Sequence, residues 1–299
     1  MLHTPFFHML AEGPFSGITT LSTSGSPRRS IESEAFLANA RQARLAAGIK
    51  EWPGDDTPSR FHYISAHSPW WRPNHLFLKL APCVSYNDHA GATSPAFYTR
   101  FGWKFLPNAL AVTGLVESEG KMLISRRLKA DYKKGGLHFS MGGFISVSKE
   151  PTGDPVAALL RELKEEVGLE PHEVEKITCL GIAWDPLQNK PDVLFRVKTR
   201  VPIAIIKERA IDHENTNYWM PIRPDYANHL IANAAHSVVP MGLAALLHTG
   251  RGHFGRHWFD QWVMRLSKLG EGYDRPEIRT AAEMKDIAKV DMLLGELCA

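Results

Sequence analysis

The chain has 299 residues, of which 44% are hydrophobic, and its formal net charge at pH 7 is +3. A chain of this length can bury a core, and its small positive charge excludes the concentrated basic surface of a dedicated nucleic-acid-binding protein. The three cysteines, Cys83, Cys179 and Cys298, are too far apart for a disulfide framework or a CxxC metal site, which favours a reducing compartment. A long apolar run and a secretory signal pattern are both absent from the sequence. We therefore expect a cytoplasmic protein that binds neither a membrane nor nucleic acid.

The first third of the chain predicts a small unit of mixed structure. Residues 19–30 are rich in Ser, Thr, Gly and Pro and indicate a loop, and the apolar spacing from Ile31 to Ala47 indicates a helix. Two short strands are expected at Phe61–Ser65 and His75–Leu80, which are bounded by Pro and Asn. Residues 1–104 are thus predicted to form an N-terminal α+β unit with a flexible first segment.

The rest of the chain predicts a sheet flanked by helices. The strand-like segments are 109–116, 121–127, 137–144, 177–183 and 192–201, and a strong helical pattern spans 155–167. The tail indicates several helices, among them His253–Leu269 and Ala281–Leu297. We predict an α/β sandwich with a mixed sheet over residues 105–250 and a helical extension over residues 251–299.

The helix predicted after residue 154 has unusually well specified ends. Asp154 suits the N-cap, Pro155 the first helical position, and Gly168 the C-terminal cap. At about 100° per residue, three carboxylates fall on one face, those of Glu162, Glu165 and Glu166. The opposite face is apolar and is expected to be buried, with Val156, Leu160, Leu163 and Val167. The helix therefore presents an acidic face to its surroundings.

Neighbouring carboxylates repel one another and raise each other's pKa unless a cation is close. A hard, oxygen-seeking cation such as Mg²⁺ would relieve that repulsion. The alternative is an ordinary solvated acidic face. The surrounding sequence separates these two interpretations.

The segment Arg161–Leu169 reads RELKEEVGL. It resembles the REUxEExGU half of the Nudix box, in which U is a bulky aliphatic residue, and so resembles the Nudix hydrolase family. This resemblance implies a Nudix α/β/α sandwich whose glutamates, here Glu162, Glu165 and Glu166, bind Mg²⁺ or Mn²⁺. It also implies hydrolysis of a nucleoside diphosphate linked to another group.

The first half of the box departs from the family pattern. The Gly142-Gly143 pair lies too far upstream, and Gly153 occupies the position of the family's first glutamate. Glu150 and Asp154 are the two candidates to replace that carboxylate, although neither is in register with the family pattern. The sequence leaves open which of the two takes its place.

Other segments resemble the branch of the family that hydrolyses UDP-glucose and UDP-galactose and also has an irregular box. They run in the same order along the chain: residues 59–62, 78–80, 85–88 with Gly91 and Thr93, 126–127, 142–143, 180–183 and 213–216. The resemblance implies a small-molecule substrate, a nucleoside diphosphate sugar, that is cleaved to UMP and a sugar 1-phosphate.

The predicted substrate-binding residues precede the helix and are Arg126, Arg127, Gly142 and Gly143. Arginine can bind phosphate through a bidentate fork, and lysines at 129, 133 and 134 add positive charge nearby. Because Arg126 and Arg127 alternate across a strand, we expect only one of them to face the site.

Two further groups have both a functional and an ordinary interpretation. Glu214 lies in a predicted loop and is either an additional catalytic or metal-binding carboxylate or a solvated side chain. Four aromatic residues either stack on uracil or belong to the core: Phe61, Tyr63, Trp70 and Trp71.

Two other functions remain compatible with these features. One is a Nudix hydrolase that acts on ADP-ribose, NADH or another nucleoside diphosphate derivative. The other is a non-catalytic nucleotide-binding module that keeps the Nudix fold, which the irregular first half of the box favours. Either a monomer or an oligomer is compatible with the sequence.

Overall fold

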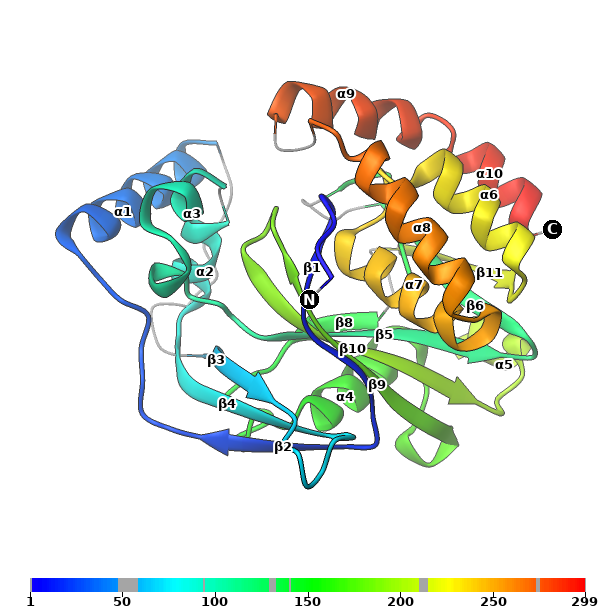
Figure 1. Ribbon diagram of the computed structural model, residues 1–299, viewed down its shortest axis with the longest axis horizontal. Coiled ribbons are helices and arrows are strands. Elements are labelled where there is room, and N and C mark those ends of the chain that lie inside the picture. Colours follow the sequence, from blue (N-terminus) through cyan, green and yellow to red (C-terminus); the bar gives the residue numbers. More distant parts are fainter. Residues whose placement is uncertain are drawn as a thin grey trace.

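A computed structural model describes residues 2–47, 59–93, 95–128, 133–139, 141–209, 215–272 and 275–298. A large sheet lies in the middle of the molecule, with α4 and a smaller sheet on one side and helices α6, α7, α8 and α10 on the other (Figure 1). The helices α1, α2 and α3 form a separate group beside the small sheet (Figure 1). The predicted α/β sandwich with a mixed sheet and an α+β N-terminal part is confirmed.

The large sheet has the strand order β1-β9-β10-β5-β6-β11, with β7 beside β6 and β8 beside β5. Strand β10 pairs with β5 in parallel and with β9 in antiparallel orientation, so the sheet is mixed. Its strands are β1 His8–Phe15, β5 Ala111–Ser118, β6 Lys121–Arg127, β7 Leu137–His138, β8 Met141–Phe144, β9 Val174–Asp185, β10 Lys190–Thr199 and β11 Asn215–Pro221. Every residue of β5 is buried, as expected of a strand covered on both faces.

Strand β1 joins the large sheet although it comes first in the chain. It pairs with β9 in antiparallel orientation, and Phe6, Phe7 and Met9 are fully buried in the same core cluster as Leu180. The N-terminal part thus contributes a strand to the sheet of the central part. The division of the chain at residue 105 stays a prediction.

The small sheet contains β2 Gly17–Ser22, β3 Arg60–His67 and β4 His75–Val84, in the order β2-β4-β3. The predicted loop at 19–30 is wrong for residues 19–22, which pair with β4 in parallel orientation. Strand β2 lies at the edge of the small sheet, where a strand has only one partner and tolerates polar residues. The composition of these residues therefore resembles that of a loop. The predicted helix from Ile31 is confirmed.

The helices and 3-10 turns complete the fold. They are α1 Ile31–Ala46, α2 Tyr86–Ala92, α3 Pro95–Phe101, η1 Trp103–Phe105, α4 Pro155–Val167, η2 Pro171–Glu173, α5 Ile203–Arg209, α6 Pro224–Ala234, α7 Pro240–Phe254, α8 Arg256–Leu269, α9 Pro276–Ile287 and α10 Val290–Cys298. None of the helices in the described part of the chain combines the length and the apolar character that crossing a bilayer requires.

Two predicted segments are each divided in the structure. The strand predicted at 137–144 is two strands, β7 and β8, which pair with different neighbours. The helix predicted at 281–297 is likewise two helices, α9 and α10, which are separated at residues 288 and 289. Apolar periodicity shows which residues face a core but does not show where the backbone changes direction.

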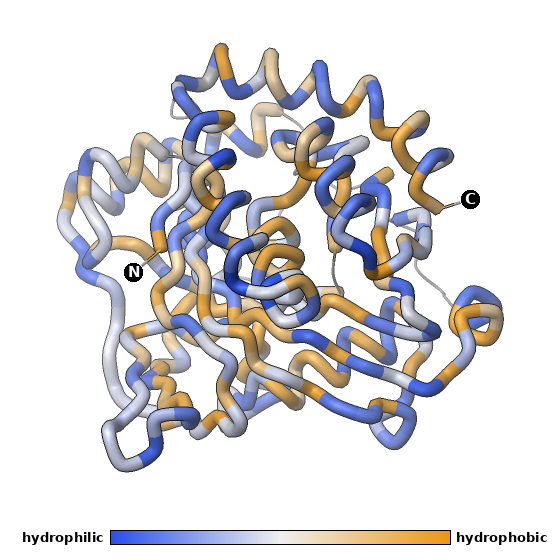
Figure 2. Tube along the Cα trace, turned by 45° about the vertical axis from the view of Figure 1, so that its right-hand side comes forward, coloured by the Kyte–Doolittle hydropathy of each residue, from blue (hydrophilic) through white to orange (hydrophobic). Residues whose placement is uncertain are grey.

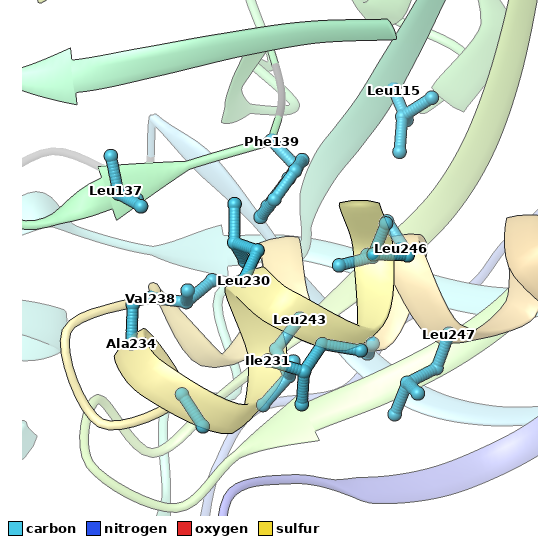
Figure 3. Packing of buried hydrophobic residues seen from close by; sticks show 14 of the residues in the cluster. Leu115, Leu137, Phe139, Leu230, Ile231, Ala234, Val238, Leu243, Leu246 and Leu247 are labelled. Atoms are coloured by element: carbon cyan, nitrogen blue, oxygen red, sulfur yellow. The ribbon is translucent and has the colours of Figure 1, made fainter. Parts of the chain in front are cut away.

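Each face of the large sheet has its own core. Leu115 faces the core under α6 and α7, where Figure 3 shows it with Phe139 and Leu246, whereas Val116, its neighbour in β5, faces the core under α4. Successive residues of a strand point to opposite faces, which explains the division. Hydrophobic stretches are prominent in the interior strands, while the outer helices alternate between hydrophobic and hydrophilic residues (Figure 2).

Candidate active site

Helix α4 is held at both ends by the predicted caps. The Asp154 carboxylate accepts a hydrogen bond of 2.8 Å from the backbone N–H of Val156, and Pro155 occupies the first turn. Gly168 has a φ of 67°, in the left-handed region, and its N–H bonds to the carbonyl of Lys164. These ends fix which residues of the helix face the sheet.

Glu162 lies on the buried face of α4, against strand β8. A Cβ added to Gly143 would lie 2.0 Å from Glu162 Oε1, so a side chain at this position would displace the Glu162 carboxylate. Burial raises the pKa of the Glu162 carboxyl, and the charge of Arg161 opposes this increase only in part. The predicted buried face is thus corrected: Glu162 belongs to it, and Val156 and Leu160 are only partly buried. Its fully buried apolar residues are Ala158, Leu159, Leu163 and Val167.

Arg161 connects several acidic groups through one guanidinium. Its Nη1 lies 2.6 Å from Glu162 Oε1 and 3.1 Å from Glu165 Oε2. Its Nε lies 2.7 Å from Glu150 Oε1, and its Nη2 donates to the carbonyl of Phe144. The guanidinium therefore fixes the orientation of both helix carboxylates relative to β8.

Of the two carboxylates considered for the missing glutamate, Glu150 lies beside Arg161 of the helix. It is buried, and its second oxygen accepts a hydrogen bond of 2.8 Å from the N–H of Ser146. Asp154 instead caps the helix. Gly153 has a φ of 68°, and a Cβ there would lie 2.9 Å from Leu80, so this position in the turn has no room for a glutamate.

The other two helix glutamates differ in exposure. Glu165 is exposed and lies 3.2 Å from Lys149 Nζ. Its slight burial works to raise its pKa, but Lys149 and Arg161 outweigh that effect, and its pKa is lowered. Glu166 is partly buried.

The residue types at this site suit a hard divalent cation. Glu150, Glu162 and Glu165 bring three negative charges to the two positive charges of Arg161 and Lys149, and carboxylate oxygens are the ligands preferred by Mg²⁺ and Mn²⁺. Within the described residues, no three acidic, histidine or cysteine side chains already converge on one point. The assignment of Glu162, Glu165 and Glu166 as metal ligands therefore stays a prediction.

A pocket of about 530 Å³ opens beside β8, and Gly143 borders both this pocket and Glu162. Gly142 and Arg127 also line it. Arg126 points elsewhere and forms an ion pair with Asp291 of α10. Of the two adjacent arginines, Arg127 is thus the one at the pocket.

The pocket wall contains charged residues that sequence reasoning missed. Lys190 Nζ lies 2.5 Å from Asp192 Oδ1, and Thr113 donates a hydrogen bond of 2.8 Å to the other oxygen of Asp192. Arg44 of α1 supplies another cation. The sequence did contain a signal for Lys190 and Asp192. They are two positions apart at the start of an apolar strand, and residues with this spacing share one face of the strand.

Burial shifts the pKa values of several groups that line the pocket, among them Asp185 and His89. Burial raises the pKa of Asp185 to about 6, although Lys190 opposes this change. Burial, together with the charges of Lys190, Arg60 and Arg44, lowers the pKa of His89 to about 3. His89 is therefore neutral at pH 7, and the positive charge of the pocket comes from arginine and lysine.

The remaining predicted residues lie away from the pocket or outside the described part. Glu214 and Lys129 fall outside the described residues. Trp70 and Trp71 are 88% and 62% exposed in the turn between β3 and β4, and Phe61 and Tyr63 are core residues. Of the described residues that line the pocket, none is among these four aromatics.

Comparison with known proteins connects this site to a family. A family model described as NUDIX domain matches residues 106–225. A NUDIX hydrolase from Nitrosomonas europaea is similar in structure, with 17% identity, a TM-score of 0.34 and coverage of 48% of this chain and 88% of that chain. No curated protein matches the chain by sequence.

Two other solved structures match this chain over only part of their own length. Tm1382, described as a candidate Nudix hydrolase, shares 14% identity over 41% of this chain and 62% of its own, with a TM-score of 0.31. A bifunctional NMN adenylyltransferase/ADP ribose pyrophosphatase from Francisella tularensis, complexed with AMP and a Mn ion, shares 17% identity over 54% of this chain and 46% of its own, with a TM-score of 0.35. The chain thus spans less than two thirds of either protein. The family match therefore covers residues 106–225, which include strands β5 to β11 and helix α4.

Proposed function

We propose that the chain is a divalent-metal-dependent hydrolase that cleaves the diphosphate of a nucleoside diphosphate sugar. The substrates would be UDP-glucose and UDP-galactose; water adds across the P–O–P bond and gives UMP and a sugar 1-phosphate. The observation that carries this proposal is the position of Gly143, which borders the acidic helix α4 on one side and the pocket on the other.

The pocket suits a diphosphate in charge and in size. Arg44, Arg127 and Lys190 contribute three positive charges against the two negative charges of Asp185 and Asp192. Its volume of about 530 Å³ lies within the range of roughly 300–1,000 Å³ that is common for small-molecule sites. These side chains would bind the phosphate oxygens and orient the P–O–P bond toward β8.

The chain's own residues would prepare the reacting end of the pocket. Glu162, Glu165 and Glu166 would hold the metal ion, and Arg161 would keep Glu162 and Glu165 in place. When bound, a divalent cation neutralises charge on phosphoryl oxygens and lowers the pKa of a bound water. Gly143 would let the buried carboxylate of Glu162 come close to the pocket.

The choice of a UDP-sugar rests on the segment that includes Ser85 to Thr93. Ser85 begins α2 by accepting a hydrogen bond of 3.0 Å from the N–H of Asp88. His89, Ala90 and Thr93 then line the pocket. Part of the segment that resembles the UDP-sugar branch therefore lines the pocket, which supports that substrate class.

A substrate panel tests this proposal. The full chain with Mg²⁺ is incubated with UDP-glucose, UDP-galactose, ADP-ribose and NADH, and the products are identified by ³¹P NMR. We expect UMP and sugar 1-phosphate to form faster from the UDP-sugars than AMP forms from ADP-ribose. The reverse ranking would overturn the substrate class, and the absence of turnover for all four would favour the non-catalytic module.

A further inference from the structure

The adjacent residues Arg126 and Arg127 connect two different parts of the molecule. Arg127 lines the pocket, and Arg126 forms an ion pair with Asp291 of α10. The C-terminal helices therefore contact the strand that carries a pocket cation, although they lie outside the matched Nudix segment.

The backbone of Arg127 is bonded into the connection between β6 and β7. Its N–H donates to the carbonyl of Gly136 at 2.9 Å, and its carbonyl accepts from the N–H of Gly135 at 2.6 Å. Gly136 packs so closely on the next segment that an added Cβ would lie 2.3 Å from the carbonyl oxygen of Ser237. Gly135 and Gly136 therefore hold the backbone position from which the Arg127 side chain extends.

Lys133 anchors the same connection to α9. Its side chain is only 2% exposed, and its Nζ lies 2.8 Å from Glu283 Oε1 and donates to the carbonyl of His236. A buried ammonium that loses its carboxylate partner is costly, so Glu283 is needed to keep Lys133 inserted. Contact at Gly135 is also close, because a Cβ there would lie 3.2 Å from Ile287 of α9.

We propose that α9 and α10 position Arg127 for diphosphate binding, Glu283 acting through Lys133 and Asp291 acting through Arg126. Glu283 and Asp291 are positioning residues, because each would act through the cation that it pairs with and not on the ligand. The inference rests on the proposed function, because it takes the pocket as the diphosphate site. If α9 and α10 only complete the core, their ion pairs would affect the free energy of unfolding but not the binding of diphosphate by Arg127.

A double-mutant cycle on binding separates these two roles. Binding of inorganic pyrophosphate to the full chain is measured by calorimetry in the presence of EDTA, for the wild type, Arg127→Gln, Glu283→Gln and the double variant. We expect Arg127→Gln to weaken binding about tenfold, as for a lost charge-assisted contact, and Glu283→Gln to weaken it about fivefold. The double variant should bind no more weakly than Arg127→Gln alone, because Glu283 acts through that arginine.

The matched control is Glu277→Gln, the same change at an exposed position of α9, which should bind like the wild type. Asp291→Asn removes an exposed partner and keeps the fold; it should weaken binding about twofold, and this effect should also disappear in the Arg127→Gln background. Effects that multiply in the double variants would overturn the inference, as would wild-type protein that does not bind pyrophosphate.

The cycle requires no turnover and is therefore independent of the substrate panel. A non-additive cycle in a chain that hydrolyses none of the four substrates would support the positioning role and reject the hydrolase. An additive cycle in an enzyme that hydrolyses UDP-sugars would support the hydrolase and reject the positioning role.

Discussion

Helices α4 and α7 pack on opposite faces of the same sheet, but they expose very different surfaces. Helix α7 is buried along residues 240–250, whereas α4 buries one side and carries Glu165 and Glu166 on its other side. A helix buried all round can contribute packing but cannot present charged groups to a ligand. The charged groups that could carry chemistry are thus on the α4 side, whereas α7 contributes mainly packing and lines the pocket with the apolar side chain of Met241.

The two helices also begin differently. A carboxylate caps α4, whereas the residue before α7 is Val239, whose side chain cannot accept a hydrogen bond. An isolated helix with such a start is marginal, so tertiary burial must stabilise α7. Figure 3 shows this burial, with Leu243 and Leu247 of α7 close to Ile231 of α6.

The largest expected effect is that of Glu166→Gln on α4. If the acidic face performs the chemistry, kcat should fall on the order of 10²- to 10³-fold, the loss typical when one group that stabilises developing charge is removed. The melting temperature should stay near that of the wild type, because Glu166 is only partly buried. Steady-state kinetics with UDP-glucose and thermal unfolding measure the two quantities.

The control for this variant is Glu208→Gln, the same change at an exposed position of α5. It should leave kcat unchanged. A Glu166→Gln enzyme with wild-type kcat would mean that the acidic face of α4 is not the reacting site.

The contrast between the helices also explains what the sequence could predict. Helix α4 was predicted to the residue because Asp154, Pro155 and Gly168 mark its ends and its apolar residues recur at helical spacing. Helix α7 is apolar on all sides and has no such periodicity, so the sequence indicated helices in this region without their limits. Local signals define a helix that faces solvent better than one that is buried.

The site was predictable only where its parts are close in sequence. The acidic face of α4 follows from residue spacing, but Arg44, His89 and Lys190 come from separate segments that the fold brings together. Strand alternation predicts that one of two adjacent arginines faces the pocket. Which one it is depends on how the sheet packs in the fold, where Arg126 pairs with Asp291 of the distant helix α10.

The second expected effect concerns the α7 side. Leu246 is fully buried, so Leu246→Ala should lower the free energy of unfolding by about 2–5 kcal/mol, the cost of lost burial plus a cavity. Below its unfolding transition, the variant should keep kcat and KM within about twofold of the wild type, because the pocket lining does not include this leucine. Urea unfolding and kinetics at low temperature test both statements.

Met264→Ala is the control for this cavity. Met264 is 62% exposed on the neighbouring helix α8, and its loss should change the free energy of unfolding by less than about 0.5 kcal/mol. A Leu246→Ala enzyme that folds but loses kcat as severely as Glu166→Gln would break the proposed division between the two faces.

The smallest expected effect is a pH dependence located on the α7 side. Burial, and to a lesser degree the charge of Arg251, lowers the pKa of His248 from 6.5 to about 4. The unfolded chain therefore binds more protons than the folded chain between these pH values, and the stability that neutral His248 contributes above pH 6.5 is lost as the pH falls toward 4. Because His248→Gln cannot titrate, the wild type should lose about 2 kcal/mol more than this variant between roughly pH 7 and pH 4.5.

The matched control for this difference is His172→Gln, at an exposed position in η2, which should keep the wild-type pH dependence. Urea unfolding at the two pH values gives the free energies. Comparing the change with pH, rather than the absolute stabilities, removes the cost of placing an amide in the core. Equal pH dependence in the wild type and His248→Gln would mean that the α7 side accommodates a charge, and the contrast with α4 would then rest on packing alone.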